Sequence, residues 1–414
     1  MNNDKIATYK NLAHVLGILI ILTMAFFMNC KMDKDSRAQK TEKRLDISQE
    51  SLDKFCDLVE TKRKEYQVPG MAIAIVMYND IILREKFGWA NAEEKIPVTD
   101  KTIFPIGSST KPFTSTLIAK LVTDGTMNWD DPVKQYLPYF VLKIKTDNPD
   151  DQVTIRDLLS HRTGFFHMDM IQNIVNWEQD PNWDINKDPT RYSREDLLKA
   201  ATKYEPKDTF RTKHNYSNIS MVAAALASGQ AASTNWDKLM TDKLFKPLKM
   251  KNTTTSINQI KNLHNVAKGY LKSKEGNQPA ELINMDIISP AGGINSNIAD
   301  MTQWLRFLLS EGTLKGRQLI RPDEIQEMWT TQIEGAEVGG LNPPGTSYGL
   351  GWFIHEWKGY KIVEHKGNAL GYSTNLALIP EIGIGYAMLS NVLPNPMQGE
   401  LDEMVWEALG LGKE

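Results

Sequence analysis

The chain has 414 residues, of which 41% are hydrophobic and 24% are charged, a composition typical of an ordinary globular protein. The formal net charge of −3 gives no electrostatic basis for binding nucleic acid, which needs a basic face. Two cysteines are too few for a disulfide framework, and the seven histidines include no pair at the helical spacing of zinc hydrolases. We therefore expect no nucleic-acid partner, no metal and no cofactor.

Residues 1–30 resemble an export signal. Basic residues precede an apolar run over residues 15–28, and this run of about 14 residues is shorter than the roughly 20 that a spanning helix needs. Cys30 follows directly, as the lipidated cysteine does in a bacterial lipoprotein signal. An uncleaved anchor is the alternative, but the basic residues among 31–44 would then crowd the translocated side, contrary to the positive-inside tendency. We expect a protein of the bacterial cell envelope, periplasmic or at the cell surface, with a membrane tether through its N-terminus and Cys30 as the lipid-attachment residue.

The elements that follow alternate in type along the chain. Residues 31–45 are polar and charged and predict a tether, and the folded part at 46–414 opens with an amphipathic helix that Pro69-Gly70 ends. Strands are expected at residues 71–77 and 81–87, which form a hairpin, and later at 360–364, 372–379 and 384–389. The chain closes with a second amphipathic helix, for which Gly410 is the expected cap.

The middle of the chain is mostly helical in pattern. Strands near both ends with helices between them predict an α/β (α+β) fold, in which one antiparallel sheet combines the N- and C-terminal parts and helices flank it. We expect a sheet subdomain from about residues 46–105 and 290–414. A helical subdomain, about residues 106–289, is inserted between its two halves.

The first chemical motif lies in residues 104–113. Phe113, Leu117 and Leu121 recur at helical spacing, so Ser108 lies at a helix start, where free backbone N–H groups stabilise negative charge. Lys111 comes one turn later on the same face, and a buried lysine loses proton affinity and can assist deprotonation of the serine hydroxyl. The alternative for this pair alone is a helix cap beside a solvated lysine.

Two further segments carry suitable residues. Tyr216 and Asn218 precede an alanine-rich helix, where the tyrosine can exchange a proton with Ser108 and the asparagine can donate to a substrate amide. Residues 364–368 end a strand, where Gly367 allows substrate backbone to lie close and the N–H of Asn368 can join that of Ser108 in an oxyanion hole. Taken singly, these segments also fit a helix cap beside a core tyrosine and a hairpin with an incidental histidine.

The three motifs in this order resemble those of the serine β-lactamase and penicillin-binding-protein superfamily. The Tyr-x-Asn form of the second motif is similar to class C β-lactamases, D-alanyl-D-alanine peptidases and β-lactamase-fold esterases. The resemblance covers roughly residues 48–410 and includes further family landmarks: Val68-Pro69-Gly70, Asp130-Asp131-Pro132-Val133, residues 154–164, Ala291-Gly292-Gly293 and Gly349-Leu350-Gly351-Trp352. It implies a site between the sheet and the helical region.

The resemblance also implies roles for residues of this chain. Ser108 would be the acylated nucleophile and Lys111 its activating partner, and Tyr216 would be a general base or proton shuttle. Asn218 would bind the substrate amide, and Gly367 and Asn368 would belong to the substrate-binding strand and the oxyanion hole. Whether Lys111 or Tyr216 takes the first proton stays open.

One residue departs from the class C pattern. Those enzymes carry lysine at the start of the third motif, where this chain has His365, which is mostly neutral at pH 7 and holds a substrate carboxylate less well. We therefore rank β-lactam hydrolysis below hydrolysis of a peptide, ester or amide, with a small-molecule or peptidoglycan-derived substrate. The rival from another class is a penicillin-binding or peptidoglycan-sensing module that does not turn over.

Other segments match catalytic motifs only by chance or are expected to determine substrate specificity. Residues 345–349 match the Gly-x-Ser-x-Gly pattern of α/β-hydrolases, but they lead into a strand and lack the strand-to-helix elbow which that chemistry needs. His161 and His167 are expected to form local hydrogen bonds. Substrate specificity is expected in the loops at residues 165–190 and 330–348.

Overall fold

The computed structural model describes residues 45, 47–165, 191–336 and 343–412, and residues 47–414 group into one compact unit. The expected export signal, Cys30 and nearly all of the tether at 31–45 lie outside the described residues. Within the described ranges, the structure contains no helix that is both long enough and apolar enough to cross a membrane.

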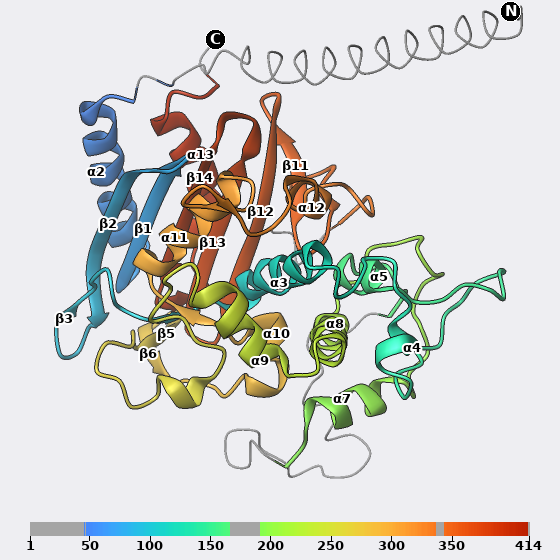
Figure 1. The fold of residues 1–414 in the computed structure, drawn as a ribbon. Helices are drawn as coiled ribbons and strands as arrows, with labels where there is room; N and C mark the ends of the chain where they lie inside the picture. Colours follow the sequence, from blue (N-terminus) through green and yellow to red (C-terminus); the bar gives the residue numbers. More distant parts are fainter. Residues whose placement is uncertain (1–44, 46, 166–190, 337–342, 413–414) are drawn as a thin grey trace, which may run out of the picture. The chain divides into compact units, whose positions relative to one another are not determined.

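The two ends of the folded part combine in one antiparallel sheet of eight strands. Its strands, in spatial order, are β10 (Ser347–Tyr348), β11 (Phe353–Trp357), β12 (Tyr360–Ala369), β13 (Tyr372–Ile379), β14 (Ile384–Ser390), β1 (Gly70–Met77), β2 (Asp80–Asn91) and β3 (Ile96–Pro97). Strand β1 pairs with β14 along its length, so the N-terminal hairpin lies directly beside the C-terminal strands (Figure 1). This arrangement confirms the predicted fold class.

Helices bury both faces of the sheet. Helices α2 (Gln49–Glu65) and α13 (Met397–Ala408) pack together and α13 contacts β13, whereas α11 (Ile298–Leu309) packs on β1 and β14. Strand β1 is buried along seven of its eight residues, because a strand covered on both sides needs apolar side chains on both. Gly410 has a φ of +76° directly after α13, which fits its expected capping role.

The segment between the two halves of the sheet is mainly helical. Its helices include α3 (Lys111–Thr123), α4 (Val133–Tyr136), α5 (Ile155–Leu159), α7 (Arg194–Ala201), α8 (Asn218–Ala231), α9 (Trp236–Leu239) and α10 (Ser289–Gly292), and α12 (Pro322–Met328) follows α11. Short strands also occur: β4 (Phe104–Pro105) with β7 (Asn295–Ser296), β5 (Gly269–Ser273) with β6 (Gly276–Ala280) and β15 (Val392–Leu393), and β8 (Thr313–Leu314) with β9 (Arg317–Gln318).

Two features differ from the sequence-based expectation. Strands β5 and β6 lie in the stretch expected to be helical, because β5 is held by parallel pairing with β15, from a distant part of the chain. Strand β12 runs five residues beyond the predicted end at residue 364, because pairing with Tyr372–Asn375 of β13 holds residues with little strand preference of their own.

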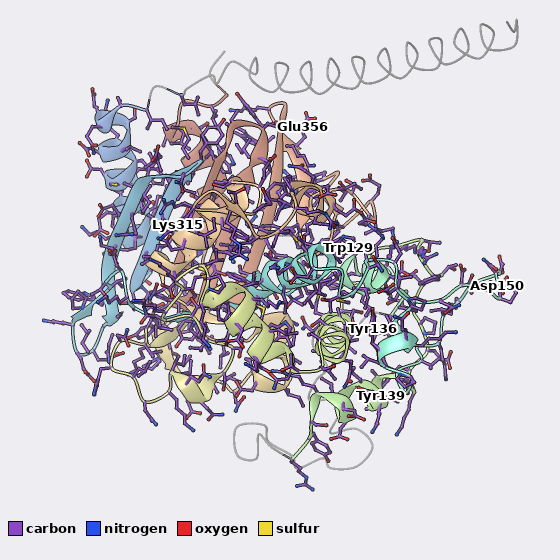
Figure 2. All side chains as sticks on the ribbon, viewed as in Figure 1. Trp129, Tyr136, Tyr139, Asp150, Lys315 and Glu356 are labelled. Carbon is purple, nitrogen blue, oxygen red and sulfur yellow. The ribbon has the colours of Figure 1, made fainter. Side chains whose placement is uncertain are left out.

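Helix α3 is the central element of the core. Phe113 of α3 stacks on Trp304 of α11 at 3.9 Å between ring centroids, and Trp304 stacks in turn on Trp352 at 5.8 Å. Trp129, which is labelled in Figure 2, follows α3 in the chain. Its indole N–H donates a hydrogen bond to Glu324 of α12 over 2.5 Å. These contacts hold α3 and the segment that follows it against α11 and α12.

Candidate active site

The turn Gly107–Thr110 precedes α3 and presses against β12; we refer to it as the Ser108 turn. A Cβ atom on Gly107, whose φ is +52°, would lie 2.5 Å from the Asn368 carbonyl oxygen, and one on Gly367 would lie 2.1 Å from the Ile106 carbonyl oxygen. Only glycine allows backbones to approach so closely at both positions. The backbones of Ser108 and Asn368 are therefore neighbours, although they are far apart in the chain.

Lys111 lies beside the Ser108 hydroxyl. Its Nζ is 3.0 Å from Ser108 Oγ and 2.9 Å from the carbonyl oxygen of Ala291 in α10. The Lys111 side chain is fully buried, and this burial holds its pKa well below the usual value. Among the described residues, no carboxylate counteracts this decrease in the pKa. A neutral amine can donate to Ala291 and offer its lone pair to the Ser108 O–H.

Tyr216 completes this group from the segment before α8. Its ring centroid is 4.4 Å from Lys111 Nζ, and its hydroxyl forms a hydrogen bond with Ser108. Burial raises the pKa of Tyr216, and the hydrogen bond with Ser108 offsets only part of this effect, so the phenol stays protonated at neutral pH. The structure thus places the Lys111 amine and the Tyr216 hydroxyl beside the same serine hydroxyl.

Asn218 is the first residue of α8, partly exposed and one position beyond the helix cap. The cap is Ser217, whose Oγ accepts a hydrogen bond from Ser220 N–H at 3.2 Å. The asparagine side chain is therefore not needed to cap the helix.

The third predicted motif forms an open strand edge. Strand β11 pairs with β12 only from Tyr360 to Glu364, so the part of β12 from His365 to Ala369 has no strand on that side among the described residues. Asn368 in this part is exposed, and Gly367 is buried against the Ser108 turn. An extended substrate can lie along such an edge and form main-chain hydrogen bonds with it.

His365 is buried and neutral. Its Nδ1 lies 2.7 Å from the carbonyl oxygen of Lys366, which can only accept, so Nδ1 carries the proton. Its Nε2 then accepts a hydrogen bond from the Tyr348 hydroxyl at 3.2 Å. Burial is the main cause that holds the pKa of His365 well below its usual value. The neighbouring Lys366 contacts Glu364 at 3.5 Å and Asp402 at 3.3 Å and is almost fully buried with them.

Two residues near the site were not assigned to it from the sequence. His161 Nδ1 accepts a hydrogen bond from Ser217 N–H at 3.3 Å, and its ring centroid lies 4.7 Å from that of Tyr216 and 5.0 Å from that of Tyr348. The hydrogen bond agrees with the local role expected for His161, whereas His167 lies outside the described residues. Tyr348 lies in the Gly-x-Ser-x-Gly pentapeptide at residues 345–349, which the sequence analysis interprets as a chance match. No other feature of the sequence indicates that Tyr348 lies near the site.

Ser347 of that pentapeptide does not have a catalytic environment. It lies in the edge strand β10, and its Oγ is 2.8 Å from Thr331 Oγ1 and 3.3 Å from the Ile354 carbonyl oxygen. No strand-to-helix elbow is present at this position, and the segment is an edge strand followed by β11.

A buried carboxylate holds together the loops that carry His161 and Tyr216. Asp157 accepts hydrogen bonds from Arg162 at 2.7 Å and Arg211 at 2.9 Å, and it is fully buried. Burial alone would raise the pKa of Asp157. The pKa is instead held below its usual value by hydrogen bonds from Arg211 and the Thr154 backbone and by the charge of Arg162. These ion pairs fix the approach of the two loops to Lys111.

A family model described as Beta-lactamase matches residues 55–410, so the chain belongs to the β-lactamase family. The unguisins hydrolase ungD' of Aspergillus campestris (strain IBT 28561) is 28% identical over 346 residues, which are 81% of this chain and 61% of the relative. Protein flp of Staphylococcus aureus (strain MW2) is 25% identical over 350 residues, 84% of this chain and 64% of that protein. The chain thus spans somewhat less than two thirds of these two curated relatives.

Solved structures with the same fold are similar to this chain. The octameric penicillin-binding protein homologue from Pyrococcus abyssi superimposes with a TM-score of 0.71 at 26% identity, covering 88% of this chain and 78% of that one. EstCE1, a hydrolase with promiscuous acyltransferase activity, superimposes with a TM-score of 0.72 at 18% identity, covering 87% and 98%, and this likeness shows the fold alone. The family predicted from the three motifs is confirmed.

Proposed function

We propose that the protein is a serine hydrolase that acts through an acyl-enzyme on Ser108. The observation that carries this proposal is the contact of Ser108 Oγ with the buried amine of Lys111, 3.0 Å away, together with its hydrogen bond to Tyr216. A lysine in its neutral form can accept the serine proton, and a protonated phenol can donate one to a leaving group. The directions of the two pKa shifts favour Lys111 as the first proton acceptor.

In the proposed reaction, Ser108 Oγ bonds to the substrate acyl carbon while its proton passes to Lys111 Nζ. The N–H groups of Ser108 and Asn368 would hold the oxyanion that forms. The bond from the acyl carbon to the leaving group then breaks, and the leaving group takes a proton from Tyr216, which regains one from Lys111. Water next attacks the acyl carbon and gives one proton to the same pair. The bond from the acyl carbon to Ser108 Oγ then breaks, Ser108 Oγ takes that proton back, and the acid is released.

The preferred substrate is a peptide, ester or amide that does not need a cation to hold a carboxylate. His365 is neutral where class C β-lactamases carry a lysine, and Lys366 is bound to two carboxylates. Both observations support ranking efficient β-lactam hydrolysis below carboxypeptidase-like or esterase-like activity. Asn218 is proposed to bind the substrate amide.

The test compares two serine variants of the soluble domain on 4-nitrophenyl acetate. Ser108→Ala should lower kcat by about 10³-fold or more, since it removes the covalent step. Ser347→Ala, a buried serine in the rival pentapeptide, should retain the parent rate. The opposite pattern would assign the chemistry to Ser347, and a stoichiometric burst without turnover would identify a covalent sensor.

For the N-terminus, we propose export to the bacterial cell envelope and tethering through lipid on Cys30. The support is the sequence pattern of residues 1–30 alone. Radiolabelled palmitate should be incorporated into the full chain expressed in a bacterial host and lost in Cys30→Ser. Equal incorporation in both chains, or none in either, would contradict lipidation at Cys30.

A further inference from the structure

Two buried hydroxyl groups, those of Ser109 and Thr374, join the Ser108 turn to the sheet. Ser109 is the residue after the proposed nucleophile, and Thr374 lies in β13. Ser109 Oγ lies 3.1 Å from the carbonyl oxygen of His365, and Thr374 Oγ1 lies 2.9 Å from that of Ile106. The two hydroxyl oxygens are 2.8 Å apart. We refer to this pair of hydroxyl groups as the hydroxyl clamp.

All three contacts of the clamp cross from the turn to the sheet. The carbonyl oxygens of His365 and Ile106 can only accept, so the two hydroxyl protons can serve any two of the three contacts at once. Whichever two are made, both hydrogen bonds connect the side of Ile106 and Ser109 with the side of His365 and Thr374. Neither Ser109 nor Thr374 has any exposed surface, so water does not compete for these bonds.

This pattern differs from that of a buried hydroxyl with a local role. Thr302 in α11, for example, donates to the carbonyl oxygen of Ile298, four residues earlier in the same helix. Ser109 instead bonds to His365, which is 256 residues away in the sequence. An apolar pair would fill this space without the cost of burying hydroxyl groups, whereas a satisfied polar network selects one relative position of its parts.

Helix α13 fixes the strand side of the clamp. The buried amide of Gln398 donates from Nε2 to the carbonyl oxygens of Thr374 at 2.9 Å and Gly367 at 3.3 Å. Its own main-chain oxygen accepts from Asn375 Nδ2 at 2.9 Å. Strands β12 and β13 are therefore held together at the level of the clamp, where Gly367 and Thr374 are paired.

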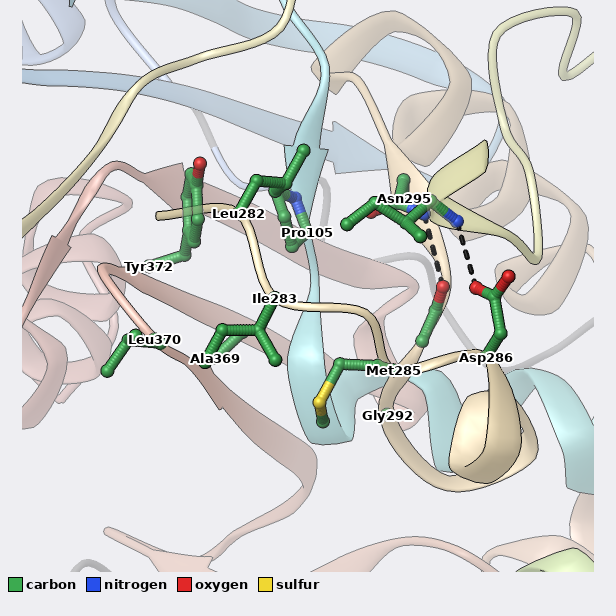
Figure 3. Close-up of a pocket in the computed structure, with 12 residues that line it drawn as sticks. Pro105, Leu282, Ile283, Met285, Asp286, Gly292, Asn295, Ala369, Leu370 and Tyr372 are labelled. Atoms are coloured by element: carbon green, nitrogen blue, oxygen red, sulfur yellow. Dashed lines mark hydrogen bonds between the residues drawn. The ribbon is translucent and has the colours of Figure 1, made fainter. Parts of the chain in front are cut away.

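The packing is looser at the far end of β12. Pro105, which leads into the turn, and Ala369, which ends β12, line a small hollow together with Leu282, Ile283 and Met285 (Figure 3). Because space remains between the two segments there, their side chains do not set the spacing between turn and strand. The directional contacts that set it are those of the clamp.

The proposed oxyanion hole depends on this spacing. The N–H of Ser108 belongs to the turn and that of Asn368 to β12, and both must point at the same oxygen atom. The glycines of the two segments allow a close approach but provide no directional attraction. We propose that Ser109 and Thr374 are positioning residues, which hold these two N–H groups at the spacing that the oxyanion needs. The inference rests on the proposed function, because both residues act through the acylation of Ser108.

The experiment compares kcat/KM for 4-nitrophenyl acetate with kcat/KM for O-4-nitrophenyl thionoacetate, in which sulfur replaces the carbonyl oxygen. Sulfur accepts hydrogen bonds weakly, so the thiono ester gains less from an oxyanion hole. The oxygen-to-sulfur ratio therefore measures the hole and does not depend on how much of the protein is folded. Thr374→Val keeps the side-chain shape and removes the hydroxyl, and it should lower this ratio about tenfold, a part of the roughly 10²–10³-fold that loss of a whole donor costs.

Three further variants test the cause of that change. Thr374→Ser restores the hydroxyl and should keep the ratio within about twofold of the parent, whereas Ser109→Ala removes the other hydroxyl and should lower it as Thr374→Val does. The matched control is Thr302→Val, which removes a buried hydroxyl that bonds only within α11 and should leave the ratio unchanged.

The parent ratio in both Thr374→Val and Ser109→Ala would overturn the proposal, and if Thr374→Val does not fold, Ser109→Ala alone decides. A ratio in Thr374→Ser as low as in Thr374→Val, or an equal fall in Thr302→Val, would also overturn it. Hydrolysis that survives in Ser108→Ala would instead overturn the proposed function, so the two failures are distinct.

Discussion

Gly367→Ala tests whether close packing of β12 on the Ser108 turn sets the geometry of the site. The added Cβ would lie 2.1 Å from the Ile106 carbonyl oxygen, 2.5 Å from Thr374 Oγ1 and 2.7 Å from Ser109 N. Carbon and oxygen atoms in proteins rarely approach closer than about 3.3 Å, so strand and turn must separate by about 1 Å. Two of the three contacts are with backbone, which has no rotamer to change.

The consequence should be larger for catalysis than for folding. A displacement of about 1 Å between the N–H groups of Ser108 and Asn368 is expected to lower kcat by about 10²-fold. Overpacking of this kind destabilises a fold by about 1–3 kcal/mol, which a domain of this size tolerates. The assay measures kcat and KM on 4-nitrophenyl acetate and the midpoint of thermal unfolding for the same preparation.

Gly399→Ala is the control for the substitution itself. This position is inside α13 with open space around it, so alanine should stabilise the helix by about 0.5–1 kcal/mol and leave kcat unchanged. A folded Gly367→Ala protein with the kcat of the parent would refute the argument that this contact positions the catalytic groups.

Four further predictions concern titration, positioning and stability. Burial lowers the pKa of Lys111, and its neutral form becomes more populated as pH rises, so kcat/KM should increase with pH to a plateau. In Lys111→Arg the side chain stays cationic, and kcat/KM should fall by about 10²–10⁴-fold. Because the pKa of His365 is also held low, His365→Gln should leave the shape of the pH profile between about pH 5 and 9 unchanged; an inflection near pH 6.5 that disappears in the variant would contradict this. His161→Phe removes the acceptor for Ser217 N–H and should lower kcat with little change in KM, and an unchanged kcat would show that Tyr216 does not depend on it. Asp157→Asn removes the buried carboxylate charge that Arg162 and Arg211 contact, and it should lower the free energy of unfolding in urea by about 3 kcal/mol. Because the fold holds the pKa of this carboxyl below its usual value, its contribution is complete above about pH 4 and is lost as pH falls below that. Equal stability of variant and parent at pH 7 would contradict the assignment.

The sequence predicted the features that depend on short stretches of chain. Helix α3, the hairpin β1–β2 and the turn between β13 and β14 follow from local apolar periodicity and from glycine or proline at fixed offsets. The pairing of the two ends of the folded part was expected from the order of strands and helices, and the register of β1 against β14 realises it. The proximity of Ser108 and Lys111 follows from helical spacing alone.

The remaining parts of the site depend on contacts between distant segments. His161 and Tyr348 lie far apart in the sequence, and no local pattern indicates that their rings lie 5.0 Å apart. The apolar residues Leu282, Ile283 and Met285 have no strand or helix periodicity, so nothing in the sequence marks them as the wall of a hollow. The low proton affinity of His365 likewise depends on burial, which tertiary packing produces.

The most direct test of the central claim is covalent labelling of the soluble domain with a fluorophosphonate and, separately, with a fluorescent penicillin, followed by intact-protein mass spectrometry and peptide mapping. The account predicts one phosphonyl adduct on the peptide that contains Ser108, and no adduct in Ser108→Ala. With 4-nitrophenyl acetate it predicts an acetyl adduct at the same residue that decays with time. Labelling of a different serine, or no labelling of a folded protein, would contradict the account.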